Sequence, residues 1–211
     1  MRGDHDFIHR FEPGPDDGAS PTLLLLHGTG GSEDDLIPLA HQLAPRSALL
    51  SPRGKVLEGG VAARFFRRHG EGVLDVEDLK ARTDELAGFV RRAAGEYGFE
   101  PAGLIALGFS NGANVATTLL FRHPDLLAGA ALLRPMLPYL PDPLPDLAER
   151  SVLIDAGSAD PMVPADQPPA LAELLSEAGA EVTVQMTPGA GHGLVQADLD
   201  ALLEWFQRVP S

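Results

Sequence analysis

The chain has 211 residues, 44% of them hydrophobic, and carries a formal net charge of -14 with a sequence pI of about 4.7. One hydrophobic core can organise a chain of this length, so we expect a single domain spanning residues 1–211. The acidic charge disfavours nucleic acid and anionic lipid as partners, and the absence of cysteine excludes disulfides, a thiolate nucleophile and cysteine metal sites.

The first ten residues are charged and contain no apolar run of the kind found in signal peptides. Apolar runs elsewhere, such as residues 23–26, are far too short to cross a bilayer. We therefore expect a cytoplasmic protein that does not bind membranes.

The predicted elements alternate between strand and helix. In chain order we expect an edge strand at 7–11, a buried strand at 22–26, a helix at 32–43 and a strand at 48–51. Ser32 and Asp35 have the spacing of a capping box at the start of that first helix.

A long amphipathic helix is predicted from Val76 to Tyr97, because its apolar residues recur at intervals of three and four and Asp75 can cap its start. The remaining strands are expected at 103–107, 127–133, 152–156 and 181–186, and the remaining helices at 111–122, 168–178 and 194–207. This alternation predicts an α/β fold with a mostly parallel sheet and helices on both faces. Segments 53–72 and 135–145 are expected to be ordered loops.

A serine lies between two glycines in the stretch GFSNG, residues 108–112, directly after a predicted strand and before a predicted helix. A sharp strand-to-helix turn exposes such a serine at the edge of the sheet, and its neighbours must be small for the chains to pass. Although the bare motif also occurs in ordinary glycine-rich turns, this context predicts that Ser110 is a nucleophile.

A serine nucleophile needs a base, and seven histidines compete for that role. His192 follows the last predicted strand and lies between Gly191 and Gly193, so its loop can turn the imidazole over the edge of the sheet. The other histidines lie in the polar N-terminal segment, on or at the end of predicted helices, or in other loops. We therefore expect His192 to be the base.

The carboxylate that orients the base has two candidates in the stretch SVLIDAGSADPMVP. Asp160 falls in the loop after a strand, whereas Asp155 falls within the strand, where an unpaired carboxylate is costly to bury. We favour Asp160 and keep Asp155 as the alternative. The chain order serine, aspartate, histidine is that of hydrolases with this serine turn.

A glycine-rich turn follows the strand at 22–26, and its Thr29 can supply a backbone N–H beside that of Asn111 to form an oxyanion hole. His27 in that turn is expected to brace the loop. The turn does not fit the dinucleotide motif, because Glu33 occupies the position of its last glycine, and no phosphate-loop lysine follows. We therefore expect no cofactor.

The segments LHGTGG, SPRGKVLEGGVAARFFRRHGEGVLDVEDL, GFSNGANVA, GSADPMVP and GAGHGL are spread over most of the chain, from residue 26 to residue 194. Together they resemble the α/β-hydrolase superfamily, and more closely its phospholipase/carboxylesterase family of acyl-protein-thioesterase-like esterases. The arginine-rich segment is most similar to the bacterial carboxylesterase branch associated with quinone and aromatic-compound resistance. The resemblance implies an α/β-hydrolase domain in which Ser110, Asp160 and His192 hydrolyse carboxylic esters without a metal or cofactor. Asn111 is a departure, because thioesterase relatives commonly carry glutamine there.

Two apolar segments are expected to form the substrate pocket, with Phe65 and Phe66 facing Met136 and Leu137. No large cap is expected, because the segment between residues 133 and 152 is only a proline-rich loop, so short acyl chains should be preferred. The arginines beside the phenylalanines, Arg64, Arg67 and Arg68, have two interpretations. They can hold an anionic group of the substrate or, as we favour for most of them, pair with nearby carboxylates such as Glu71, Asp75 and Glu77.

The sequence therefore predicts a serine carboxylesterase for small esters, working as a monomer or homodimer. An acyl-thioesterase or lysophospholipase is the alternative enzyme, and a non-catalytic ligand-binding protein of the same fold is the alternative of another class.

Overall fold

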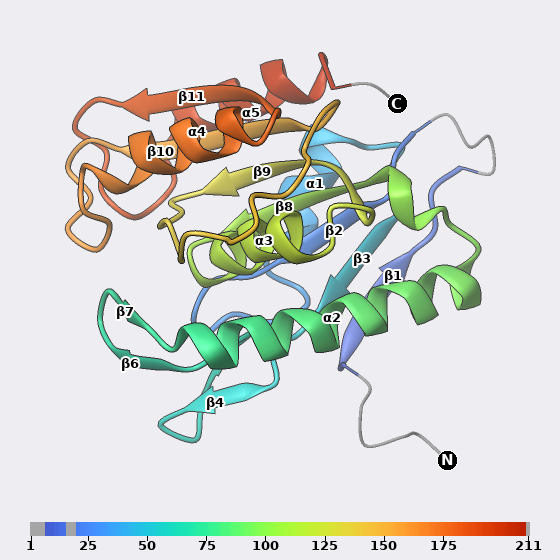
Figure 1. Ribbon diagram of the computed structural model, residues 1–211. Coiled ribbons are helices and arrows are strands. Elements are labelled where there is room, and N and C mark those ends of the chain that lie inside the picture. The colour runs from blue at the N-terminus through green and yellow to red at the C-terminus, as the bar shows by residue number, and fades with distance from the viewer. Residues whose placement is uncertain (1–6, 16–19, 210–211) are drawn as a thin grey trace.

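A central seven-stranded sheet organises the computed structural model, which describes residues 7–15 and 20–209 (Figure 1). The strands are His9–Glu12 (β1), Leu23–Leu26 (β2), Leu49–Pro52 (β3), Leu104–Phe109 (β8), Leu127–Leu133 (β9), Ser151–Gly157 (β10) and Glu181–Thr187 (β11). Their order is β1-β3-β2-β8-β9-β10-β11. Only the edge strand β1 is antiparallel to its neighbour, so the mostly parallel sheet is confirmed.

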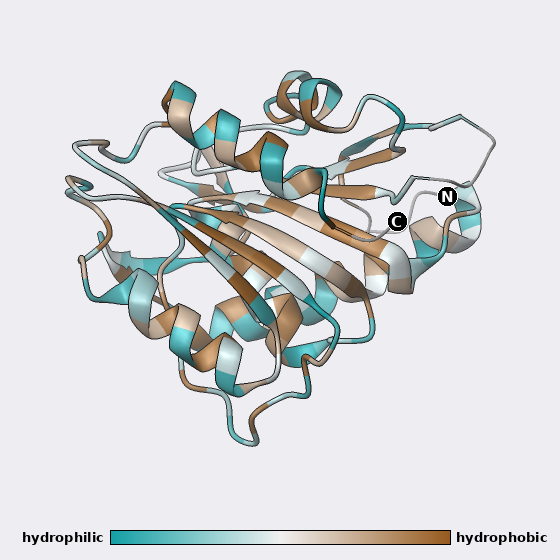
Figure 2. Cartoon of the chain, turned by 90° about the horizontal axis from the view of Figure 1, so that it is seen from above, coloured by the Kyte–Doolittle hydropathy of each residue, from teal (hydrophilic) through white to brown (hydrophobic). Residues whose placement is uncertain are grey.

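Helices cover both faces of this sheet. They are Ile37–Leu43 (α1), Val76–Tyr97 (α2), Asn111–Arg122 (α3), Gln167–Glu177 (α4) and Gln196–Phe206 (α5), with a short 3-10 helix at Pro101–Gly103 (η1). Residues of α2, α3 and α4 pack into the core on one face, and residues of α1 and α5 pack into the core on the other. Seen from above, the central strands are largely hydrophobic while the helices alternate between hydrophobic and hydrophilic bands (Figure 2). No helix within the described residues is long and apolar enough to cross a membrane.

Helix α2 forms where its sequence predicts it. The side chain of Asp75 accepts a hydrogen bond from the backbone N–H of Asp78 at 3.1 Å and thereby caps the first turn. Gly98 ends the helix in the left-handed conformation, with φ of 76°. The residues at three- and four-residue spacing, including Leu79, Leu86 and Val90, are buried against the sheet.

Helix α1 begins five residues later than predicted. Ser32 donates a side-chain hydrogen bond to Asp35, but the two residues belong to a turn that precedes the helix. Pro38 explains the late start, because proline has no N–H for an intrahelical bond and is tolerated only in the first turn. A helix from Ser32 would have placed this proline in its interior.

The segment 53–72 was predicted to be a loop, and it instead contains most of two small hairpins. Val56–Glu58 (β4) pairs with Ala62–Arg64 (β5), and Arg68–Gly70 (β6) pairs with Val73–Leu74 (β7). Each strand has only two or three residues, which is too short for an alternating pattern to be recognised. By contrast, the proline-rich stretch between β9 and β10 contains no helix or strand, as predicted.

Candidate active site

Four loops at the carboxyl edge of the parallel strands carry the residues singled out from the sequence. Thr29 follows β2, Ser110 follows β8, Asp160 follows β10 and His192 follows β11. Parallel strands end at the same edge, so residues far apart in the chain meet there (Figure 1).

Ser110 lies in the sharp turn that joins β8 to α3. Its φ and ψ of 52° and -109° are strained for a residue with a side chain. A Cβ atom on Gly112 would lie 1.9 Å from the carbonyl oxygen of Leu26, so only glycine fits where the turn passes β2. The predicted strand, serine turn and helix are therefore all present.

The side chains of Ser110, His192 and Asp160 form one hydrogen-bonded row. Nε2 of His192 is 2.8 Å from Oγ of Ser110, and its Nδ1 is 2.8 Å from Oδ2 of Asp160. The second oxygen of Asp160 accepts hydrogen bonds from the backbone N–H groups of Met162 and Val163. A carboxylate can only accept, so Nδ1 carries the proton and Nε2 is left to accept the proton of the serine hydroxyl. This geometry suits nucleophilic catalysis by serine.

Asp155 takes no part in this row. It is fully buried in β10, where its Oδ2 accepts a hydrogen bond from Nη1 of Arg134 at 2.9 Å. Burial raises the pKa of Asp155 to about 7, although the nearby Arg134 acts in the opposite direction. Of the two aspartates that the sequence left open, only Asp160 contacts His192.

Thr29 and Asn111, the predicted oxyanion-hole residues, line the same pocket as Ser110 and His192. Among the described residues, no hydrogen bond uses the backbone N–H of Thr29 or of Asn111. Residues at the end of the β4–β5 hairpin bind the side chains of both. Arg64 donates to the Thr29 hydroxyl at 2.6 Å, and the N–H of Phe65 donates to Oδ1 of Asn111 at 2.8 Å. The two N–H groups are thus held in place and available to a ligand.

His27 braces the loop after β2, as the sequence predicts. Its Nδ1 lies 2.6 Å from the carbonyl oxygen of Gly28, and its Nε2 accepts a hydrogen bond from the backbone N–H of Gly54. Burial lowers the pKa of this imidazole, which keeps it neutral.

The pocket at Ser110 is small, with a volume of about 40 Å³. Its lining residues are Thr29, Arg64, Arg68, Gly72, Leu74, Ser110, Asn111, Asn114, Arg134, Met136, Met162, Val163 and His192. Of the four residues predicted to form its wall, only Met136 is among them. Phe65, Phe66 and Leu137 instead pack into the hydrophobic core, and the ring of Phe65 lies 4.7 Å from that of His27. The prediction for these three was wrong, because the end of the β4–β5 hairpin and the proline-rich loop turn their apolar side chains inward.

The three arginines Arg64, Arg67 and Arg68 were expected either to hold an anionic group of the substrate or to pair with carboxylates, and the structure places them differently. Arg67 pairs with Asp75 and Asp78 and does not line the pocket, as expected for a structural residue. Arg64 and Arg68 line the pocket, and both pair with Glu58.

Comparison with known proteins identifies the family of the chain. The family model of the dienelactone hydrolase family matches residues 77–202. The chain belongs to this family. The protein named "Putative hydrolase MhqD" of Bacillus subtilis (strain 168) is 43% identical over 199 residues, which is 94% of this chain and 97% of that protein.

Solved structures give the same result. A Bacillus cereus carboxylesterase is 44% identical, covers 96% of this chain and 94% of its own, and superposes with a TM-score of 0.92. A carboxylesterase from Mesorhizobium loti is 35% identical, with coverage of 93% and 98% and a TM-score of 0.81. The resemblance to α/β-hydrolases of the phospholipase/carboxylesterase type is confirmed, and the chain is a carboxylesterase-like hydrolase.

Arg134 is the residue near the site that sequence analysis missed. It follows β9 with φ of 56°, its side chain is fully buried, and it lines the pocket. Its guanidinium donates to the carbonyl oxygens of Gly191 and Gly193, the two neighbours of His192, at 3.0 and 3.1 Å. A single arginine at the end of an apolar strand was the available signal, because a charge in that position requires partners.

Proposed function

We propose that this protein is a serine carboxylesterase that hydrolyses small, short-acyl esters through an acyl-enzyme on Ser110. The observation that carries the proposal is the row of two 2.8 Å hydrogen bonds that links Ser110 to His192 and His192 to Asp160. The high identity to two carboxylesterases of known structure supports it.

In the first half-reaction, Oγ of Ser110 bonds to the ester carbonyl carbon while its proton passes to Nε2 of His192. Asp160 stabilises the imidazolium, and the N–H groups of Thr29 and Asn111 donate to the carbonyl oxygen as it becomes negative. The carbon–oxygen bond to the alcohol then breaks, and His192 returns the proton to the departing alcohol oxygen.

In the second half-reaction, water replaces the alcohol. His192 takes a proton from the water, whose oxygen bonds to the acyl carbon, and the bond to Ser110 breaks as Oγ recovers its proton. The products are one carboxylic acid and one alcohol, so all atoms balance without a cofactor.

The preference for short acyl groups is proposed from the walls of the site. The stretch between β9 and β10 adds no helical cap, and Leu140 on it is 72% exposed. The apolar part of the pocket consists only of Leu74, Met136, Met162 and Val163. A pocket of about 40 Å³ leaves room for only a small acyl group beside Ser110.

The proposal is tested by labelling the protein with a fluorophosphonate and assaying a panel of aryl esters, alkyl esters and acyl thioesters. We expect covalent labelling of Ser110, located by peptide mass spectrometry, and turnover of short esters. Absence of labelling in the folded protein would favour a non-catalytic role, and faster turnover of thioesters than of matched esters would favour a thioesterase.

A further inference from the structure

Arg64 is a nearly buried cation in the wall of the candidate active site. Its side chain is 5% exposed, and it lines the pocket that contains Ser110. Nη1 donates to the hydroxyl of Thr29 at 2.6 Å, and Nε donates to the carbonyl oxygen of Phe66 at 3.2 Å. Within the described part of the chain, Nη2 has no hydrogen-bond partner. The guanidinium therefore keeps donors that neighbouring groups do not use.

The charge around Arg64 is only partly balanced. Glu58 is the one carboxylate paired with it in the described residues, at 3.5 Å, and the same Glu58 forms two closer hydrogen bonds to Arg68, at 2.7 and 3.2 Å. Two cations thus share one anion. Burial and the charge of Arg68 both lower the pKa of Arg64, as expected of a cation with too little compensation.

The other charged groups at the pocket have partners of their own. Arg134 is paired with Asp155 and Asp198, and Asp160 is hydrogen-bonded to His192. Arg64 and Arg68 together carry one positive charge more than the Glu58 that they share, on a chain whose net charge is -14. A cation is costly to bury without a partner, and this surplus lies where the ester must bind.

We propose that Arg64, assisted by Arg68, binds a carboxylate carried by the substrate, so that the preferred substrates are small esters with one negative charge. The inference rests on the proposed esterase function and adds the substrate class. A planar guanidinium with unused donors matches a carboxylate, and one surplus charge matches one carboxylate rather than a doubly charged phosphate.

Two matched pairs of esters test the proposal, because the charge can lie on either side of the ester bond. The first pair is 4-carboxyphenyl butyrate and its neutral methyl ester. The second is 4-nitrophenyl hydrogen adipate and its neutral methyl ester. The quantity measured is the ratio of kcat/KM for the anionic member to that for the neutral member. We expect the wild-type protein to favour the anionic member of at least one pair.

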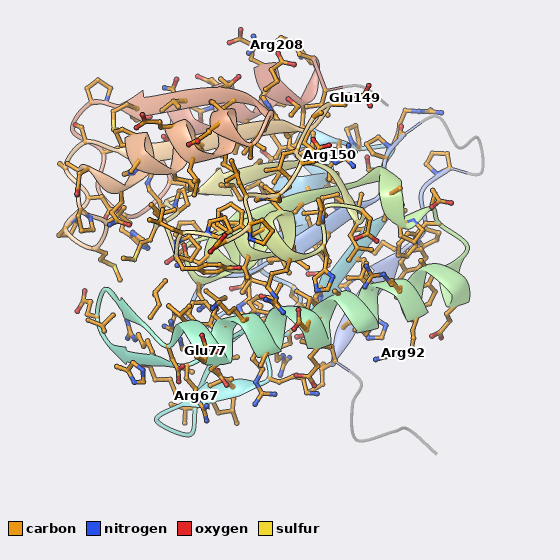
Figure 3. The ribbon with its side chains drawn as sticks, in the orientation of Figure 1. Arg67, Glu77, Arg92, Glu149, Arg150 and Arg208 are labelled. Atoms are coloured by element: carbon orange, nitrogen blue, oxygen red, sulfur yellow. The ribbon has the colours of Figure 1, made fainter. Side chains whose placement is uncertain are left out.

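Charge variants then locate the origin of the preference. Arg64→Gln and Arg68→Gln should each lower the ratio, by about tenfold or more for Arg64, the scale of a hydrogen bond to a charged group. Glu58→Gln should raise it, because the two arginines lose their shared anion. Arg67→Gln is the matched control. Arg67, labelled in Figure 3, pairs with Asp75 and Asp78 at the start of α2 and does not line the pocket, and its side chain is 63% exposed, so the ratio should not change.

The ratio separates substrate recognition from a role in holding Thr29, since loss of that role lowers turnover of both esters equally. Equal turnover of both members in both pairs, or an equal loss in Arg64→Gln, overturns the inference while leaving the esterase function intact. If no ester is hydrolysed, the esterase proposal fails, and calorimetry with monomethyl adipate still decides the inference. Binding that Arg64→Gln removes supports it, and absence of binding overturns it.

Discussion

Arg134 and Asp198 form an ion pair with no solvent exposure on either side, in which Nη2 lies 2.6 Å from Oδ2. Asp198, on α5, also accepts hydrogen bonds from the hydroxyl of Thr187 and from the backbone N–H of Val195. Because Arg134 also binds both carbonyl groups beside His192, the pair ties the histidine loop to β9 and α5. The position of the imidazole therefore depends on a buried charge network beneath it.

Replacement of Arg134 should be strongly destabilising. Arg134→Gln leaves Asp155 and Asp198 buried without a cation, which costs about 3 to 5 kcal/mol of the free energy of unfolding. Urea denaturation measures this loss. Arg91→Gln is the control, because it breaks an exposed pair with Asp125 and should cost less than about 1 kcal/mol. Similar losses in the two variants would contradict the structural role of the network.

Asp155 should make stability fall as pH rises. Its pKa is about 7 in the folded protein and about 3.9 in an unfolded chain, so between these values the folded state binds more protons. The contribution of Asp155 to the free energy of unfolding is largest below pH 4. It declines as the pH rises through 7, by up to about 1.4 kcal/mol per pH unit. Asp155→Asn keeps the side chain neutral, so its Tm relative to wild type should rise from pH 5 to pH 8. A constant difference in Tm across this range would refute the assignment.

The two aspartates should differ in their effect on activity. Asp160→Asn removes the acceptor that fixes the tautomer of His192, and kcat should fall by about 10⁴-fold. Asp155→Asn should retain most of the activity, because Asp155 does not contact His192. Steady-state assays of both variants with one short aryl ester, alongside circular dichroism to verify folding, make the comparison. The reverse pattern would make Asp155 the orienting acid.

Ser110→Ala should abolish turnover without unfolding the protein. The hydroxyl is the proposed nucleophile, and loss of one member of such a triad costs about 10⁴- to 10⁶-fold in rate. Alanine has a Cβ atom just as serine does, so the substitution does not relieve the backbone strain at the φ of 52°. Thermal unfolding should stay close to that of wild type, while substantial esterase activity in the folded variant would exclude the acyl-enzyme mechanism.

Acyl chain length should have an early optimum. Each buried methylene contributes about 0.8 kcal/mol, so kcat/KM should increase over the first few carbons and then level or fall once further carbons stay in water. A series of 4-nitrophenyl esters from acetate to palmitate, kept below micelle-forming concentrations, measures this profile. A continued increase through the long chains would favour the lysophospholipase or thioesterase alternative.

The sequence alone determined the order of the main elements and which residues of their loops form the candidate site. Periodicity of apolar residues predicts α2 and the parallel strands because burial on a sheet imposes that spacing. The local pattern around Ser110 predicts its turn because only glycine tolerates the close approach of neighbouring backbone. Asp160 and His192 could be chosen because each lies in a loop directly after a parallel strand.

Tertiary structure alone decided which side chains face the site. The orientation of Phe65 and Phe66 depends on how a hairpin of three-residue strands folds onto the core, and that packing leaves no periodic signal in the sequence. The same is true of Arg134, whose partners Asp155 and Asp198 come from distant parts of the chain. Buried charges are placed by long-range pairing, which local sequence patterns do not encode.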